Sequence, residues 1–237
     1  MRCDLPTSEL EIFDVCSQKI IIKPKIKEME GKPMIFLDLD ETIINALNKD
    51  EMKKLSKNDR DRMKLIPSHN MDDYYTIYER PYLQTFLDFL FKNFRVSVWT
   101  AASKDYALFI IKNIILQNKP ERHVEWIFFG YHCDISKKIK KSIKDLSILW
   151  DTYHIKDLNS NNVVIIDDNE EVFCANGEGN CISIKPFEVT KSKSNNDNEL
   201  KKMIPFLMSM KRNIMKGTPQ PASYVNQKMR KVSPEGQ

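Results

Sequence analysis

Two pairs of acidic residues are the part of this sequence best suited to chemistry. Asp38 and Asp40 lie at the end of the apolar run 34–38, and Asp167 and Asp168 follow a second apolar run. Because residues i and i+2 of a strand point to the same side, Asp38 and Asp40 can face one site. Neighbouring carboxylates repel each other unless a cation or a shared proton lies between them. If both runs are central strands of one sheet, these carboxylates converge on a site suited to Mg²⁺.

Apolar runs that suit buried strands alternate with amphipathic segments that suit helices. Strands are expected at 20–22, 34–38, 74–79, 94–99, 126–129, 163–166 and 181–184, and helices over 82–92, 104–117, 145–150 and 199–215. This order predicts an α/β sandwich with a mostly parallel sheet. Ligands of such sheets bind beyond the carboxyl ends of the strands, where Asp38, Thr100 and Asp167 would lie.

Two long segments are polar. Residues 45–72 are dominated by Lys, Asp, Asn and Arg, which predicts a long mobile loop. Residues 191–237 hold ten Lys or Arg and three Asp or Glu, a net charge of +7 against +4 for the whole chain. This basic tail could contact nucleic acid or an acidic partner, or it could be solvated. A nucleic-acid module is not favoured, because no aromatic residues are interleaved for base stacking.

Composition argues against several classes of protein. The five cysteines are odd in number and include no CxxC pair, so a disulfide framework is not expected and the compartment is cytoplasm or nucleus. No stretch approaches the roughly 20 apolar residues of a membrane helix, and the N-terminus has no apolar signal core. The loops GxxxxGK[ST] and GxGxxG and the helix motif HExxH are absent.

Four motifs in order resemble a known family. They are DLDET at 38–42, WTAASKDY at 99–106, KDL at 144–146 and VVIIDDN at 163–169. Together they resemble the haloacid dehalogenase superfamily, and more narrowly the FCP/SCP-like, or NLI-interacting-factor-like, phosphatases of the RNA polymerase II C-terminal domain. The resemblance covers residues 33–210, between an N-terminal extension, 1–32, and the basic tail, 211–237. It implies a Rossmannoid three-layer sandwich around the central sheet.

By motif position, the resemblance implies the catalytic roles. Asp38 would be the nucleophile that forms an aspartyl-phosphate. Asp40 would act as general acid and then as general base. Thr100 would donate its hydroxyl to a phosphoryl oxygen, and Lys144 would balance negative charge.

The resemblance also implies how Mg²⁺ would be bound. Asp38, the backbone carbonyl of Asp40 and the side chain of Asp168 would be ligands. Asp167 would orient the catalytic lysine or the metal-bound waters. Thr42 is expected to hold the loop by hydrogen bonds rather than to join in the chemistry.

Four lysines precede Lys144 and are its rivals: Lys137, Lys138, Lys140 and Lys141. Lys144 is favoured because it opens Lys-Asp-Leu before a short helix, as the family motif does. The other four suit a solvated face, or an attraction for a multiply phosphorylated substrate that would weaken with salt.

The segments between the motifs are too short for a closed cap domain. Residues 120–143 are expected to form the small β insert of the polymerase-tail phosphatases. An uncapped site admits a protein segment, so the expected partner is a phosphoprotein. The resemblance assigns Tyr106 and Arg80 to substrate binding, although Tyr106 also suits a core position on its helix.

The leading hypothesis is therefore a Mg²⁺-dependent phosphoprotein phosphatase acting on phosphoserine or phosphothreonine, with the polymerase tail as a candidate substrate. A catalytically silent adaptor that binds phosphorylated partners is the alternative. A missing catalytic aspartate would favour the adaptor, and Asp38 and Asp40 are both present. A large cap would favour a small-molecule phosphatase, and none is evident.

Overall fold

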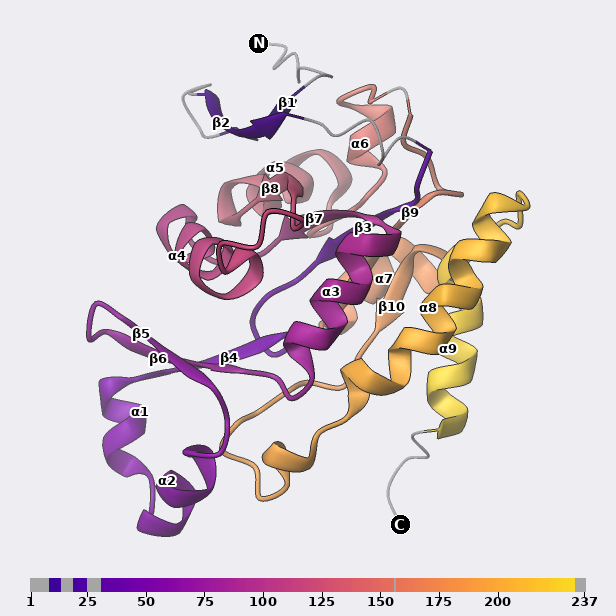
Figure 1. The fold of residues 1–237 in the computed structure, drawn as a ribbon. Helices are drawn as coiled ribbons and strands as arrows, with labels where there is room; N and C mark the ends of the chain where they lie inside the picture. The colour runs from indigo at the N-terminus through magenta and orange to yellow at the C-terminus, as the bar shows by residue number, and fades with distance from the viewer. Residues whose placement is uncertain (1–8, 14–18, 25–30, 156, 233–237) are drawn as a thin grey trace.

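A computed structural model describes residues 9–13, 19–24, 31–155 and 157–232 of the chain. Its central sheet has the strand order β10-β9-β3-β7-β8-β1-β2. These strands are β1 (Glu9–Phe13), β2 (Lys19–Pro24), β3 (Met34–Leu37), β7 (Arg95–Trp99), β8 (Val124–Phe128), β9 (Val163–Asp167) and β10 (Cys181–Ser183). Neighbouring strands are parallel except for β1 and β2, which confirms the mostly parallel α/β fold (Figure 1).

Helices cover both faces of the sheet, because alternate side chains of its strands point to opposite sides. Ile35 and Leu37 of β3 pack on one face with α3 (Leu83–Asn93), α4 (Lys104–Ile110), α8 (Glu199–Met215) and α9 (Pro221–Val232). Met34 and Phe36 pack on the other with α5 (Gly130–Lys140), α6 (Ile148–Asp151) and α7 (Glu170–Asn180). The helix expected over 104–117 continues past α4 as the wider helix η2 (Ile111–Leu116). The three-layer arrangement is therefore confirmed.

Residues 45–72 contain regular structure, so the prediction of a long loop was wrong. β4 (Ile44–Asn48), β5 (Ser68–Met71) and β6 (Tyr75–Glu79) form an antiparallel sheet in the order β4-β6-β5. Helices α1 (Lys49–Lys54) and α2 (Lys57–Met63) lie between β4 and β5. Residues 44–79 are called the insert below. Its apolar anchors are sparse and distant in sequence: Leu47, Met63, Ile66 and Tyr78 pack with Phe187 and Val189.

The small β insert was predicted in the wrong place. Within residues 120–143, β8 is a strand of the central sheet, between β7 and β1, and α5 follows it. All five residues of β8 are buried, as expected for a strand covered on both faces. The β-stranded insert instead lies between Asp40 and Thr100.

The described segments nearest to the two ends of the chain take part in the fold. In the 1–32 extension, β1 pairs with β8, and β2, which contains the strand expected at 20–22, pairs with β1. The prediction of a basic tail over 211–237 was wrong for the residues described, because α9 buries Ala222, Val225 and Met229. Its charged residues obscured this apolar stripe. Residues 233–237 lie outside the described part. Among the described residues, no helix is long and apolar enough to cross a membrane.

Candidate active site

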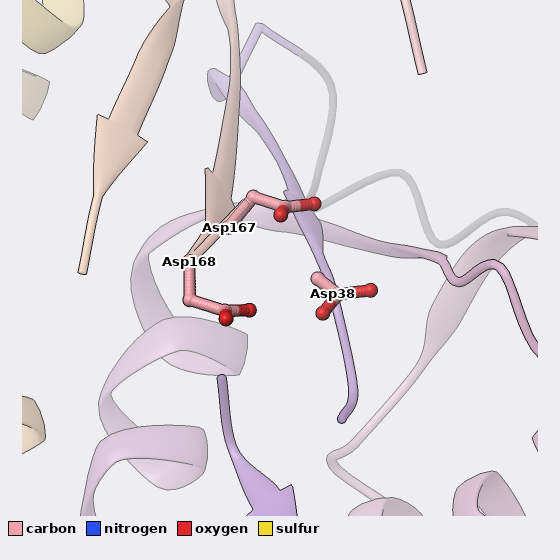
Figure 2. Close-up of side chains that lie close together, drawn as sticks. All are labelled: Asp38, Asp167 and Asp168. Carbon is pink, nitrogen blue, oxygen red and sulfur yellow. The ribbon is translucent and has the colours of Figure 1, made fainter. Parts of the chain in front are cut away.

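Three carboxylates meet at the carboxyl edge of the central sheet. Leu37 of β3 lies beside Ile166 of the parallel strand β9, so the residues that follow them emerge together. Figure 2 shows the side chains of Asp38, Asp167 and Asp168 lying close together. One oxygen from each lies within 4.8 Å of the other two. Such a set of hard oxygen donors fits a divalent cation of the Mg²⁺ type.

Lys144 supplies a positive charge to the same site. Its Nζ donates to Asp38 Oδ1 at 2.5 Å and to Asp167 Oδ2 at 2.8 Å. Burial alone would lower the pKa of Lys144, but attraction to Asp38 and Asp167 outweighs burial and raises the pKa above its ordinary value. Lys144 is therefore held as a cation, with 3% of its surface exposed.

The backbone at Lys144 is held in an unusual conformation. Its φ is 49°, in the left-handed region that costs free energy for a residue with a side chain. Asn176 of α7 donates to the carbonyl oxygen of Lys144 at 2.9 Å and accepts from the Leu146 N–H at 2.8 Å. These two bonds fix the turn that directs the ammonium group at Asp38.

Burial perturbs the acidic residues of the site. The pKa of Asp167 is raised first by burial and then by the negative charge of Asp38, with Lys144 acting in the opposite direction. The pKa of Asp168 is also raised, mainly by burial. Crowded carboxylates of this kind are stabilised by bound cations or by protons.

Asp40 faces Tyr106 rather than the cluster of three acids. The Tyr106 hydroxyl donates to Asp40 Oδ1 at 2.5 Å, and the Tyr106 ring lies edge-on to Tyr75 of the insert at 5.9 Å. Burial raises the pKa of Asp40 to about 6, with the Tyr106 hydrogen bond opposing and Asp38 adding to the rise. Tyr106, assigned by sequence to substrate binding, thus directly contacts a candidate catalytic carboxyl group.

Thr42 lies behind the carboxylates. Its hydroxyl donates to Asp168 Oδ1 at 3.0 Å and accepts from the Asp168 N–H at 3.2 Å. The first bond orients the Asp168 side chain, and the second holds its backbone. Thr42 therefore has the loop-holding contacts expected from the sequence.

Arg80 is buried and structural, so the assignment of Arg80 to substrate binding was wrong. Its guanidinium binds both carboxylate oxygens of Asp197, at 3.0 and 2.9 Å, and donates to the Thr42 carbonyl at 2.9 Å. The group also lies over the Phe187 ring. With 1% of its surface exposed, Arg80 supports Thr42 from within the protein.

Thr100 follows β7, the other neighbour of β3, and is buried. Its Oγ1 accepts from the Ala102 N–H at 3.0 Å, which leaves the hydroxyl hydrogen free to be donated elsewhere. The Cys133 thiol donates to the Thr100 carbonyl at 3.5 Å. Thr100 thus lies at the sheet edge where a hydroxyl donor was expected.

The four rival lysines lie on or next to α5 and away from the acids. Lys137, Lys138 and Lys141 are exposed. Lys140 binds Asp151 of α6 at 2.6 Å. Lys144, by contrast, forms an ion pair with Asp38, and no other described lysine between Thr100 and β9 has that ion pair.

Two residues of the site were missed by sequence reasoning. Glu41 has a left-handed backbone (φ 56°), and burial, with Asp40, Asp168 and Asp38, raises the pKa of its side chain to about 7. Its position inside DLDET was the available signal. Asn176 gave no signal, because its partners lie far away in the sequence.

Residues 33–217 match the family model described as NLI interacting factor-like phosphatase. The chain belongs to this family. Two curated relatives, from Invertebrate iridescent viruses 6 and 3, are each called putative CTD phosphatase-like protein 355R. They are 43% and 46% identical to this chain, over 71% and 74% of it and 93% and 95% of their own lengths. Membership places the chain among phosphatases of the haloacid dehalogenase type, as the motifs indicated.

A solved structure of a fission yeast RNA polymerase II CTD phosphatase, an Fcp1 variant bound to beryllium fluoride, is 19% identical, with a TM-score of 0.49. The match covers 80% of this chain and 55% of that one.

Proposed function

We propose that this protein is a Mg²⁺-dependent phosphatase that removes phosphate from serine or threonine residues of another protein through Asp38. One observation carries the proposal: Asp38 is bound by a buried lysine on one side and lies beside Asp167 and Asp168 on the other. A carboxylate repels a dianionic phosphate, so attack requires compensating positive charge. Lys144 supplies one such charge at 2.5 Å from Asp38.

This geometry supports phosphoryl transfer to Asp38. Lys144 binds Oδ1 of Asp38, so the other carboxylate oxygen is available to attack phosphorus. The bond between phosphorus and the serine or threonine oxygen breaks as an aspartyl-phosphate forms on Asp38. The Thr100 hydroxyl donates a hydrogen bond to a phosphoryl oxygen during this transfer.

Asp40 is the proposed general acid in the first step and the proposed general base in the second. Tyr106 holds one of its oxygens, and the other carries the proton given to the leaving serine or threonine oxygen. Asp40 then takes a proton from the water that attacks phosphorus. The bond between phosphorus and Asp38 breaks, inorganic phosphate leaves and the Asp38 carboxylate is restored.

Some of these acidic residues are also the proposed ligands of the metal. Asp38, Asp168 and the backbone carbonyl of Asp40 are the proposed ligands, with Asp167 orienting Lys144. Mg²⁺ held there would supply positive charge against the phosphoryl oxygens. Thr42 keeps Asp168 oriented through its two hydrogen bonds.

A phosphoprotein substrate suits the small size of the insert. Among the described residues, the segment between Asp40 and Thr100 holds a three-stranded sheet, two short helices and α3. It holds no large cap domain. An extended peptide can enter such a site. The viral relatives are named CTD phosphatase-like, so the polymerase tail, the candidate substrate from the sequence, is the first to test.

Hydrolysis of para-nitrophenyl phosphate tests the proposal, with and without Mg²⁺, for the wild type and Asp38→Asn. We expect turnover that requires both the metal and Asp38, and unchanged turnover in Asp72→Asn, an aspartate of the insert outside the site. Phosphorylated polymerase-tail peptides would then be compared. Binding of phosphopeptides by a folded wild-type protein without turnover would instead support the adaptor.

A further inference from the structure

A cavity of about 700 Å³ opens beside the candidate metal site, and apart from Asp168 its lining residues have no part in the chemistry above. Asp168 lines it at one end. Its apolar lining comes from three separate elements, through Phe173 of α7, Ile184 after β10 and Met229 of α9. The cavity therefore extends from the site along the outer edge of the central sheet.

The wall formed by α9 is firmly attached to the sheet. β10 is the edge strand, and Asn226 of α9 occupies its open side, accepting from the Ser183 N–H at 3.1 Å and donating to the Cys181 carbonyl at 2.8 Å. The family match ends at residue 217, before α9 begins. This wall is therefore a feature of the chain outside the matched domain.

Charged side chains line the cavity, and two of them, of opposite sign, have no ion pair within the described residues. Lys185 and Glu170 line the cavity, are exposed, and make no ion pair or side-chain hydrogen bond there. Arg230 and Glu199 also line it, but Arg230 pairs with Glu178 at 2.9 Å and Glu199 with Lys202 at 3.0 Å.

Lys185 lies close in the fold to the candidate active site. Ser183 of β10 pairs with Asp167 of β9, so Lys185 emerges just past the end of β10 at the same edge of the sheet as Asp168. A substrate residue close to the phosphorylated one could therefore reach it.

We propose that this cavity binds the substrate polypeptide next to its phosphorylated residue. An apolar side chain of the peptide lies against Phe173, Ile184 and Met229, and an acidic side chain pairs with Lys185. The occupant is a peptide because the cavity is continuous with the site at Asp168 and offers both an apolar surface and an uncompensated charge. This inference rests on the proposed phosphatase function and assigns that function a specificity surface.

The test compares Lys185→Glu with Lys193→Glu, an equal charge reversal at an exposed lysine outside the cavity. The substrates are para-nitrophenyl phosphate and three phosphoserine peptides that differ in having Asp, Ala or Lys on both sides of the phosphoserine. For Lys185→Glu we expect a fall of about tenfold in kcat/KM for the Asp peptide and a rise for the Lys peptide. The small substrate and the control variant should show little change.

A leucine-flanked peptide tests the apolar surface. The wild type should prefer it to the alanine-flanked peptide by about 10-fold, the value of burying one side chain in an apolar pocket. Equal changes for the Asp, Ala and Lys peptides, or no change in Lys185→Glu, would overturn the role of Lys185. Equal rates for leucine and alanine peptides would overturn the apolar contact.

Failure of the phosphatase proposal would be recognised separately, as absence of turnover of para-nitrophenyl phosphate by the wild type. Fluorescence anisotropy of the labelled Asp peptide would then measure binding to the same protein variants. Binding weakened about tenfold by Lys185→Glu but not by Lys193→Glu supports the cavity as a phosphopeptide site without catalysis. Equal binding by both variants contradicts it.

Discussion

The central sheet and the insert contribute to the site in different ways. Strands β3 and β9 are buried and apolar, and the candidate site residues Asp38 and Asp167 lie at their carboxyl ends. The insert has few buried residues, and its last strand leads to Arg80, whose contacts reach Thr42 and Asp197. The carboxylates Asp38 and Asp167 thus come from strand ends, whereas the groups that hold the site in place come from contacts between residues distant in the sequence. Substitutions in the two regions should therefore differ in their effects on stability and on activity.

The largest effect on stability and activity is expected from Lys144→Met, because Lys144 pairs with Asp38 at the end of β3. This change leaves Asp38 and Asp167 buried without their cation, which should cost about 3 kcal/mol of unfolding free energy. It should also lower kcat by about 10³-fold, because a charge that faces the transferred group is lost. Urea unfolding in EDTA and phosphatase assays with Mg²⁺ measure the two effects.

A second change separates these effects. Asp167→Asn in the Lys144→Met background removes one of the unpaired buried carboxylates, so it should recover at least about 1 kcal/mol of the lost stability. Activity should stay low. A double variant no more stable than the single one would contradict the charge-pairing account.

Arg80→Met tests the insert side of the comparison. Loss of the buried guanidinium leaves Asp197 and the Thr42 carbonyl without their donor, and should cost about 2–4 kcal/mol of unfolding free energy. Exposed Arg212→Met is the matched control and should change stability by less than about 0.5 kcal/mol. A raised KM with unchanged stability would restore the substrate-binding role first assigned to Arg80.

His132 of α5, whose ring stacks on Phe128 of β8, should make the stability of the central-sheet side depend on pH. Burial lowers its pKa to about 4 in the folded protein, below the ordinary value of about 6.5. The unfolded chain then takes up the proton first, so stability present above pH 6.5 is lost as pH falls toward 4.

The unfolding free energy of the wild type, measured relative to that of His132→Gln, should therefore fall by about 2 kcal/mol from pH 7 to pH 5. Urea unfolding at several pH values measures this decline, and glutamine can still accept from the Phe129 N–H. The exposed His154→Asn is the control and should give a difference independent of pH. A flat difference for His132→Gln would mean that the buried ring titrates normally.

The smallest effect is expected within the insert, from Asn48→Ala. Asn48 caps α1 by accepting from the Asp50 and Glu51 N–H groups at 2.9 and 3.0 Å. Loss of the cap should cost about 1 kcal/mol. Hydrogen exchange should rise in α1 and stay unchanged in β3 and β9. Asn48→Asp, which keeps an acceptor, should behave like wild type, and a rise that spreads to β3 would show that the two regions unfold together.

The parts of the fold that could be predicted are those with local signals. The buried strands and the helix over 199–215 were found because apolar residues recur there at strand or helix spacing. The strand expected at 74–79 is β6, but the rest of the insert was missed because its core depends on Phe187 and Val189, far along the chain. Helix α9 was missed because its lysines and arginines dominate the composition and conceal an apolar stripe.

The candidate site follows the same rule. Asp38, Asp167 and Asp168 could be placed together because each ends a recognisable strand. The burial of Arg80 could not be foreseen, because its partner Asp197 is distant and a buried arginine resembles an exposed one in sequence. Likewise, nothing local indicated that Asn176 would fix the turn at Lys144.

The most direct test of the central claim is to trap the phosphorylated enzyme. Protein incubated with a radiolabelled phosphopeptide and Mg²⁺ would be quenched in acid, digested and mapped. The account predicts an acid-stable, hydroxylamine-sensitive label on the peptide that contains Asp38, absent from Asp38→Asn and longer-lived in Asp40→Asn. Turnover with no label in any variant, or a label on a peptide without Asp38, would contradict it.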